Sequence, residues 1–161
     1  IPNDATNQGR ALLLLQSAGL IKLNDGGSPL STPADIDASA SKVKVTPVDA
    51  AQTVTSLPSV DGAVINNNFA NDAGIDPKAA LFADSAKSDN AAPYINVFAA
   101  RPEDKNNETL LKAIKIWHDP EVAKAVLKDS NNSAVLVKDR SQAELQHITD
   151  GLQADIKKAR K

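Results

Sequence analysis

The sequence predicts an α/β fold with a largely parallel sheet. Short apolar or alternating runs at residues 42–48, 62–66 and 94–100 are typical of strands, and helical patterns stand between and after them. Strands that alternate with helices indicate parallel pairing, because a parallel strand needs a crossover connection. In such a sheet, ligands bind beyond the carboxyl ends of the strands, where loops lead into helices.

The first helix is predicted over residues 8–18, with a run of leucines inside it and Gly19 at the C-cap position. A polar turn precedes it, and the side chain of Thr6 or Asn7 is placed to cap the first helical turn. The free N–H groups of a helix start favour an anion, and Arg10 adds a planar guanidinium that matches a carboxylate. This segment is therefore a candidate carboxylate-binding site, the alternative being an ordinary capped helix with a solvated arginine.

The remaining elements follow from local patterns. Residues 24–41 are rich in Gly, Ser, Pro and Asp and predict a loop with a helical turn at 34–38. Amphipathic spacing and a helix-starting proline predict further helices, and short extended runs predict further strands. In chain order they are a helix at 50–56, a helix at 69–73, a turn at 74–77, an extended segment at 80–83, helices at 107–117 and 120–128, a strand at 134–137 and a final helix at 142–158.

Two asparagines lie where an amide can meet a ligand. Asn66 ends the apolar run 63–65, although an asparagine at a strand end is also a common turn former. Asn96 lies inside an otherwise apolar predicted strand, where a buried amide needs partners from a ligand or from a neighbouring loop. Tyr94 is expected in the core or on a cleft wall, and Trp117 in the core.

Composition excludes several function classes. The chain has 161 residues with a formal net charge of −2 and without a basic block, which argues against nucleic acid as a partner. It has no cysteine, and its two histidines, His118 and His147, stand apart, so no metal or other cofactor is predicted. We find no nucleophile–base set or phosphate loop, and interpret Asp4, Asp61 and Asp72 as turn formers or caps. The sequence therefore does not predict an enzyme.

Three motifs stand in one order along the chain: IPNDATNQGRALLLLQSAGLIKL at the start, Gly62-Ala63-Val64-Ile65-Asn66, and Ala92-Pro93-Tyr94-Ile95-Asn96-Val97. Together they resemble the methionine-binding lipoproteins, the substrate-binding components of methionine ABC importers. The resemblance runs from residue 1 to about residue 128, with a looser match beyond. It implies a two-lobed periplasmic-binding-protein fold of type II, of which this chain is similar to the C-terminal two-thirds. Residues 1–68 would form the second lobe, 69–91 the hinge crossing, and 92–161 the returning part of the first lobe.

The resemblance also implies a function and its residues. The protein would capture methionine, or a close amino acid or short peptide, and deliver it to the permease of an ABC importer. Arg10 would bind the ligand's α-carboxylate, Asn66 and Asn96 would flank its head group, and Asn7 and Tyr94 would lie nearby. The alternative is a surface, structural or adhesive lipoprotein module with a degenerate pocket.

The family's location would be the cell surface or periplasm, with a lipid anchor in the membrane. This sequence shows neither a signal peptide nor a lipid-attachment cysteine, so we expect it to lack the N-terminal part of the parent protein. Such a chain would carry the head-group contacts with little of the side-chain pocket. It would also tend to self-associate through an unprotected strand edge.

Overall fold

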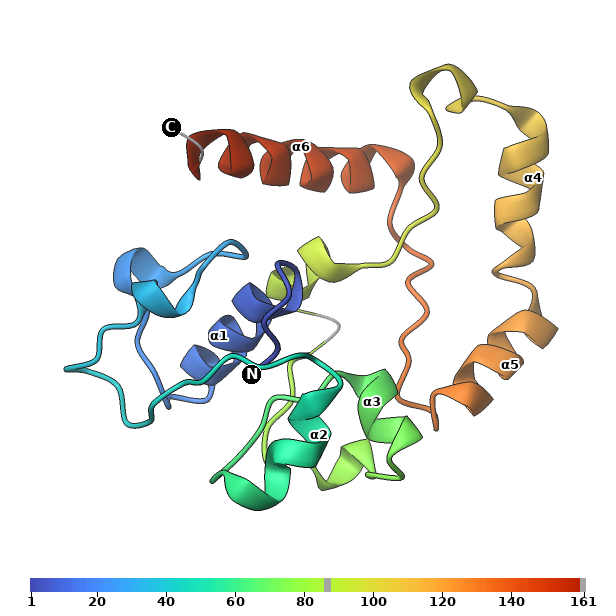
Figure 1. The fold of residues 1–161 in the computed structure, drawn as a ribbon. Helices are drawn as coiled ribbons and strands as arrows, with labels where there is room; N and C mark the ends of the chain where they lie inside the picture. The colour runs from blue at the N-terminus through green and yellow to red at the C-terminus, as the bar shows by residue number, and fades with distance from the viewer. Residues whose placement is uncertain (86–87, 160–161) are drawn as a thin grey trace. The chain divides into compact units, whose positions relative to one another are not determined.

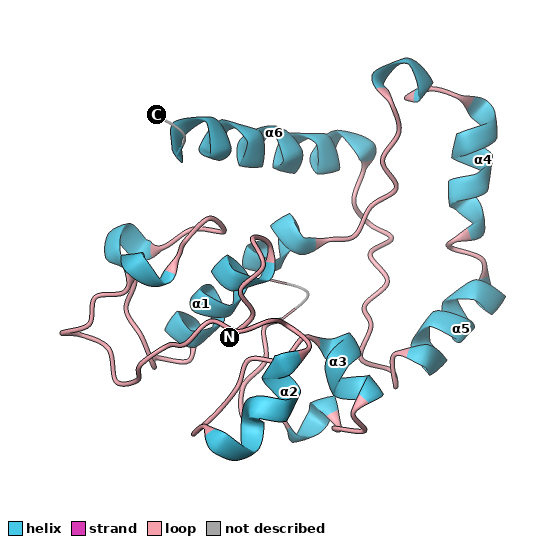
Figure 2. Cartoon of the chain, in the orientation of Figure 1, coloured by secondary structure: helices cyan, strands magenta, loops and turns pink. Residues whose placement is uncertain are grey.

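The computed structural model describes residues 1–85 and 88–159, and these residues form helices joined by loops (Figures 1 and 2). The chain divides into two compact units, Ile1–Asp84 and Ser85–Lys161. The first unit contains the helices α1 (Asn7–Ser17), α2 (Gln52–Ser56) and α3 (Asn67–Asp72), and the second contains α4 (Glu108–Ile116), α5 (Pro120–Asp129) and α6 (Gln142–Ala159). Short 3₁₀ turns lie at Asn24–Gly26, Pro33–Asp35, Leu57–Ser59, Pro77–Ala79, Asp89–Tyr94 and Pro102–Asp104.

The predicted helices are confirmed. The four longest predictions agree with α1, α4, α5 and α6 to within one residue at each end, and Pro120 begins α5 as expected. The predicted helices at 50–56 and 69–73 overlap α2 and α3, and the helical turn expected at 34–38 overlaps the 3₁₀ turn Pro33–Asp35. Local spacing and capping residues therefore suffice to locate these helices.

The predicted strands are wrong. No strand forms among the described residues, and the segments at 42–48, 62–66, 94–100 and 134–137 are loops apart from residues in turns, bends or isolated bridges. Backbone pairing is limited to two isolated bridges, Pro2 with Val48 in parallel and Leu23 with Ile36 in antiparallel orientation. An extended run becomes a strand only when a second segment lies alongside and completes the hydrogen-bond ladder. The sequence pattern indicates the extended segments but not the partner that each one needs.

Helix α1 ends as the sequence predicts. Gly19 has φ of +69°, and its N–H donates to the carbonyl of Gln16 at 2.9 Å. The N–H of Leu20 donates to the carbonyl of Leu15 at 3.0 Å. These two bonds form a Schellman motif, which requires a left-handed residue after the helix and so favours glycine there.

The core of the first unit forms against α1. Leu12 is fully buried and clusters with Ile21 and Leu23, which follow the helix. The partly buried hydrophobic residues packed around this cluster are Ile1, Leu13, Leu15, Ile36 and Val45. Burial of these side chains fixes the start of α1 relative to the rest of the unit.

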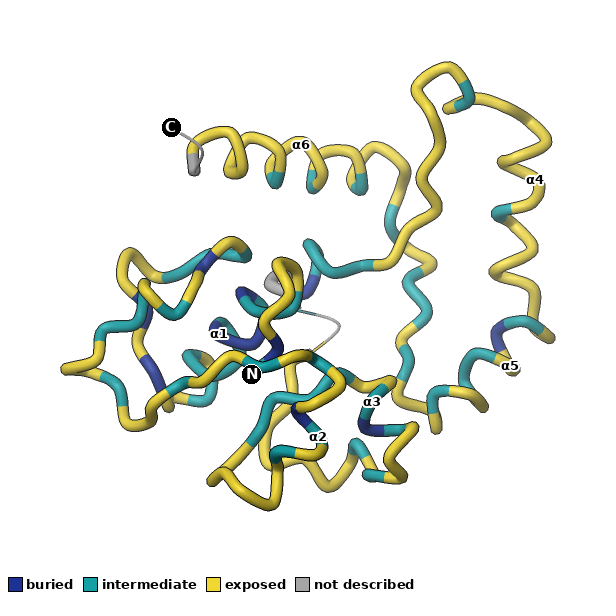
Figure 3. The backbone as a smooth tube through the Cα atoms, viewed as in Figure 1, coloured by how far each residue is buried: buried dark blue, intermediate teal, exposed yellow. Residues whose placement is uncertain are grey.

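The second unit is more open. Figure 3 shows α4 almost entirely exposed, and none of its residues is buried. Trp117, expected in the core, is 43% exposed and contacts the ring of Phe98 edge-on at 5.8 Å between centroids. Amphipathic spacing identifies the apolar face of a helix but not what covers that face. In the described part of the chain, every helix is too short or too polar to cross a membrane.

Candidate functional site

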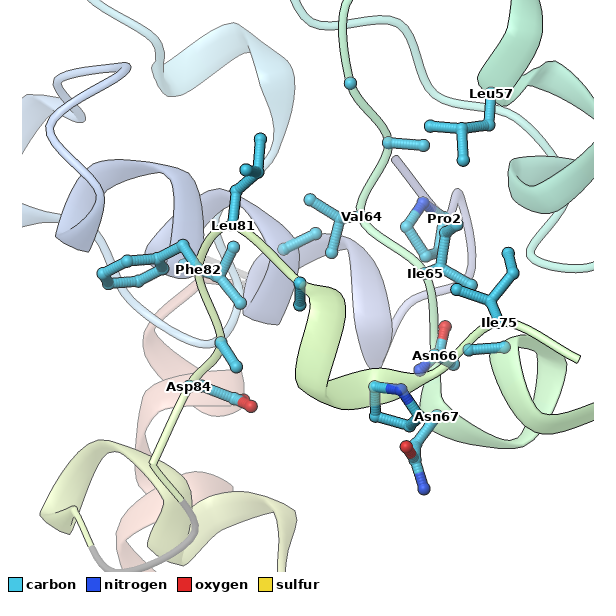
Figure 4. Close-up of a pocket in the computed structure, with 18 of the residues that line it drawn as sticks. Pro2, Leu57, Val64, Ile65, Asn66, Asn67, Ile75, Leu81, Phe82 and Asp84 are labelled. Atoms are coloured by element: carbon cyan, nitrogen blue, oxygen red, sulfur yellow. The ribbon is translucent and has the colours of Figure 1, made fainter. Parts of the chain in front are cut away.

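A pocket in the first unit is lined by Asn7, Arg10 and Asn66, which are all predicted site residues. Figure 4 shows this pocket, with Asn66 on its wall. It is lined by Pro2, by one face of α1 and by residues within the stretches 57–70 and 75–84. Its volume of about 430 Å³ lies within the range of small-ligand pockets. Helix α1 contributes one wall because residues 7, 10, 11 and 14 share one helix face.

Most of the remaining wall is apolar. Leu14 from α1 lines the pocket. Val64 and Ile65 from the loop before α3, and Ile75 and Phe82 from the segment after α3, line it as well (Figure 4). An apolar wall with a few polar groups is the usual composition of a small-molecule site. The sequence led us to expect head-group contacts with little of a side-chain pocket. The structure shows apolar residues lining this pocket as well.

The start of α1 is capped by Asp4, which corrects the predicted role of Thr6 or Asn7. Thr6 has helical dihedral angles and makes no side-chain capping bond. Asp4 Oδ1 instead accepts the backbone N–H of Asn7 at 3.0 Å, and the Asp4 carbonyl accepts the N–H of Gln8 at 2.9 Å. The anion at the positive end of the helix is therefore the chain's own carboxylate.

Hydrogen bonds connect this cap to the pocket. Asn7 Nδ2 donates to both carboxylate oxygens of Asp4, at 3.0 and 3.1 Å, and Asn66 Nδ2 donates to Asn7 Oδ1 at 2.8 Å. Asn66 Oδ1 is buried and accepts no hydrogen bond from the described residues. Asn66 precedes α3 but makes no side-chain capping bond to it, so it does not act there as a helix cap. A buried acceptor on a pocket wall is positioned to receive a donor from a bound molecule.

The pKa of the Asp4 carboxyl group is lowered. Burial raises it, but the backbone and side-chain hydrogen bonds from Asn7 outweigh that effect. Because the folded-state pKa lies below the unfolded one, the cap stabilises the fold above the ordinary carboxyl pKa. That stability is lost as the pH falls through the lowered value.

We predict that Asp4→Ala destabilises the chain by about 1 kcal/mol at neutral pH, because the first turn of α1 loses its cap. The difference from wild type should shrink as the pH falls below the ordinary carboxyl pKa of about 4, and should be lost once the pH has passed the lowered pKa of the folded state. Urea unfolding at a series of pH values measures both effects, with the exposed Asp61→Ala as the matched control. Equal stability of Asp4→Ala and wild type at neutral pH would contradict the capping role.

Arg10 lies on the pocket wall and is paired with a carboxylate that the sequence did not indicate. Arg10 Nε donates to Asp84 Oδ2 at 2.6 Å, and the two side chains are 37% and 36% exposed. Asp84 is 74 residues away along the chain, so no local pattern connects it to Arg10. The predicted carboxylate-binding side chain is thus shown binding a carboxylate, though an internal one.

Asn96 and Tyr94 belong to the second unit. Tyr94 ends the 3₁₀ turn Asp89–Tyr94 and is partly buried, while Asn96 follows in a loop and is exposed. The expectation that Asn96 lies inside a buried strand is therefore wrong, since no neighbouring segment pairs with it to form one. Among residues 1–85 and 88–159, no group of three or more His, Cys, Asp or Glu side chains could hold a metal ion.

Comparison with known proteins gives consistent matches. The NlpA lipoprotein family matches residues 1–137. The probable D-methionine-binding lipoprotein MetQ of Haemophilus influenzae is 35% identical over 136 residues, which are 84% of this chain and 48% of that protein. The chain therefore spans about half the length of the curated relatives it matches.

Solved structures give the same result. The structure of protein PG110 from Staphylococcus aureus is 41% identical, with a TM-score of 0.82 over 94% of this chain and 60% of that one. The substrate binding protein of a methionine transporter from Streptococcus pneumoniae is also 41% identical, with a TM-score of 0.68 over 82% of this chain and 51% of that one. Likeness to a substrate-binding protein of this kind is consistent with the two-lobed type II fold, although the predicted strands are not observed.

Proposed function

Because this chain belongs to the NlpA lipoprotein family, we propose that it captures methionine, or a close amino acid or short peptide, for delivery to the permease of an ABC importer. The family is one of substrate-binding transport components, which supports a role in binding for this chain. The names of the relatives support methionine as the ligand. They also support a location outside the cytoplasm, with a lipid anchor on the parent protein.

The observation that carries this proposal is the pairing of Arg10 and Asn66 with an apolar wall in one pocket. The Arg10 guanidinium suits a carboxylate, and the buried Asn66 Oδ1 suits an N–H donor such as an α-ammonium group. Leu14, Ile65 and Phe82 offer apolar surface to a side chain without charge. An amino acid with an apolar side chain carries all three complementary features.

We propose that Asn96 provides a further amide contact to the head group and that Tyr94 forms part of a cleft wall. In this scheme residues 1–68 belong to the second lobe, 69–91 to the hinge crossing and 92–161 to the first lobe. The boundary between the two compact units follows Asp84, inside that crossing, which supports the division.

A thermal-shift screen of the full chain against the amino acids tests the proposal. A ligand that binds only the folded state raises stability by about 2.7 kcal/mol at one hundred times its Kd. We expect L- or D-methionine to raise the melting temperature more than charged or small polar amino acids do. If no amino acid or short methionine peptide changes the melting temperature, the proposed function is wrong.

We predict that Asn66→Ala weakens methionine binding by about 10- to 150-fold, because a hydrogen bond to a charged group contributes about 1.5–3 kcal/mol. The melting temperature without ligand should change little, because the loss of the hydrogen bond from Asn66 to Asn7 is offset by the removal of a buried acceptor that has no donor among the described residues. Titration calorimetry measures the affinity. Asn68→Ala, at an exposed position outside the pocket lining, is the matched control. A large loss of stability with unchanged affinity would assign Asn66 a structural role.

A further inference from the structure

The Arg10–Asp84 ion pair lies within the pocket where the ligand carboxylate is proposed to bind. Both residues line that pocket, and the bond runs from Arg10 Nε to Asp84 Oδ2 at 2.6 Å. Asp84 follows the loop segment 80–83 and is the last residue of the first unit. Figure 4 shows its carboxylate near the end of that segment, at the edge of the pocket.

A ligand carboxylate and the Asp84 carboxylate cannot use the same N–H group of Arg10. Two carboxylates brought to one guanidinium also repel each other, so binding of the first disfavours the second. We propose that Asp84 is an internal carboxylate that competes with the ligand for Arg10 and so sets how strongly any carboxylate must bind to occupy the pocket. This inference rests on the proposed function, in which Arg10 binds the ligand's carboxylate.

The ion pair has the properties of a competitor that a ligand can displace. Its side chains are 37% and 36% exposed, so water can solvate the Asp84 carboxylate once it is released. Ion pairs with this exposure are weak, since solvent screens the attraction. The segment 80–84 has no regular secondary structure, so moving Asp84 breaks no helix.

Because Asp84 already occupies Arg10, a ligand must gain enough binding energy elsewhere in the pocket to displace it. An internal competitor lowers the affinity for every carboxylate by one common factor. Small anions such as acetate gain nothing else in the pocket and therefore remain weak ligands. A ligand with an apolar side chain also buries surface against Leu14, Ile65 and Phe82, and that gain allows it to displace Asp84.

Asp84→Asn in the full chain tests the proposal. Calorimetry with L-methionine and NMR titration with acetate should both give affinities about two- to fivefold higher than wild type, the range expected for an exposed ion pair. Asp72→Asn removes the same charge from an exposed position outside the pocket lining and should leave both affinities unchanged. Asp84→Ser provides a second variant without the carboxylate.

Two results would overturn the proposal. Weaker methionine binding in Asp84→Asn would mean that Asp84 orients Arg10 or binds the ligand's ammonium group. An unchanged acetate affinity would mean that Asp84 does not compete for Arg10.

The NMR signal of the Arg10 Nε–H group, identified by its loss in Arg10→Lys, gives a readout that needs no methionine. It should shift in Asp84→Asn without ligand, and in wild type when acetate is added at high concentration. If acetate displaces Asp84 while methionine does not bind, the competition stands and the proposed function fails. If methionine binds wild type and Asp84→Asn equally, the proposed function stands and the competition fails.

Discussion

Arg10→Ala is expected to abolish measurable methionine binding while the chain stays folded. A charge pair that the bound ligand itself buries costs about 2–5 kcal/mol when one partner is removed, which lowers affinity by a factor of about 30 to several thousand. Arg10→Lys should also bind poorly, because an ammonium group cannot reproduce the planar, two-pronged contact of a guanidinium with a carboxylate. Titration calorimetry of the full chain measures both variants.

The fold should tolerate the Arg10 substitutions. The Arg10–Asp84 pair is about one-third exposed and contributes at most about 1 kcal/mol to stability. Arg101→Ala is the matched control, since Arg101 also forms ion pairs, with Glu103 and Asp104, and lies in the other unit outside the pocket lining. Methionine affinity of Arg10→Ala within about twofold of wild type would refute the carboxylate-binding role of Arg10.

Gly9→Ala is expected to destabilise the first unit strongly. A Cβ atom at Gly9 would lie 2.1 Å from the backbone oxygen of Pro29 and 2.7 Å from its carbonyl carbon. The contact is with backbone, so a side-chain rotation cannot relieve it and α1 or the loop at Pro29 must shift. Overpacking of this kind costs about 3 kcal/mol. In a unit of this size, that loss lowers the melting temperature by more than about 10 °C.

Thermal unfolding of Gly9→Ala and of Gly62→Ala tests this contact. A Cβ atom at Gly62 would meet nothing within 4 Å, and Gly62 is not a positive-φ glycine, so its substitution should leave stability nearly unchanged. Because Gly9 and Arg10 are adjacent in α1, Gly9→Ala should also weaken methionine binding. Equal melting temperatures for the two variants would show that α1 does not pack closely against the loop at Pro29.

Helices were predictable because their signals are local. The glycine after α1, the proline that begins α5 and the apolar spacing within α4 and α6 each act within a few residues. Strands were not predictable in this way, because a ladder depends on a second segment that the local pattern does not specify. The run at 94–100 was the most strand-like segment in the sequence, yet it forms a loop after the turn Asp89–Tyr94.

In the candidate site, too, residues with local signals were predictable and residues that act through distant contacts were not. Arg10, Asn7 and Asn66 were predicted from position and side-chain chemistry, and all three line one pocket. Asp4 was expected only as a turn former or cap, and the structure makes it the cap of α1. Asp84 carries no local signal, because its role depends on a contact with Arg10 across 74 residues. Pairings over such distances follow from the tertiary fold and not from spacing.

The central claim is that Arg10 binds the carboxylate of the ligand, and the most direct test removes the charge from either partner. Calorimetry should compare L-methionine with its methyl ester, which keeps the side chain and the amino group but lacks the carboxylate, on wild type and on Arg10→Ala. Wild type should bind methionine at least about 30-fold more tightly than the ester. Arg10→Ala should bind the two compounds with nearly equal, weak affinity. If Arg10→Ala keeps the wild-type preference for methionine over the ester, another group binds the carboxylate and the claim is wrong.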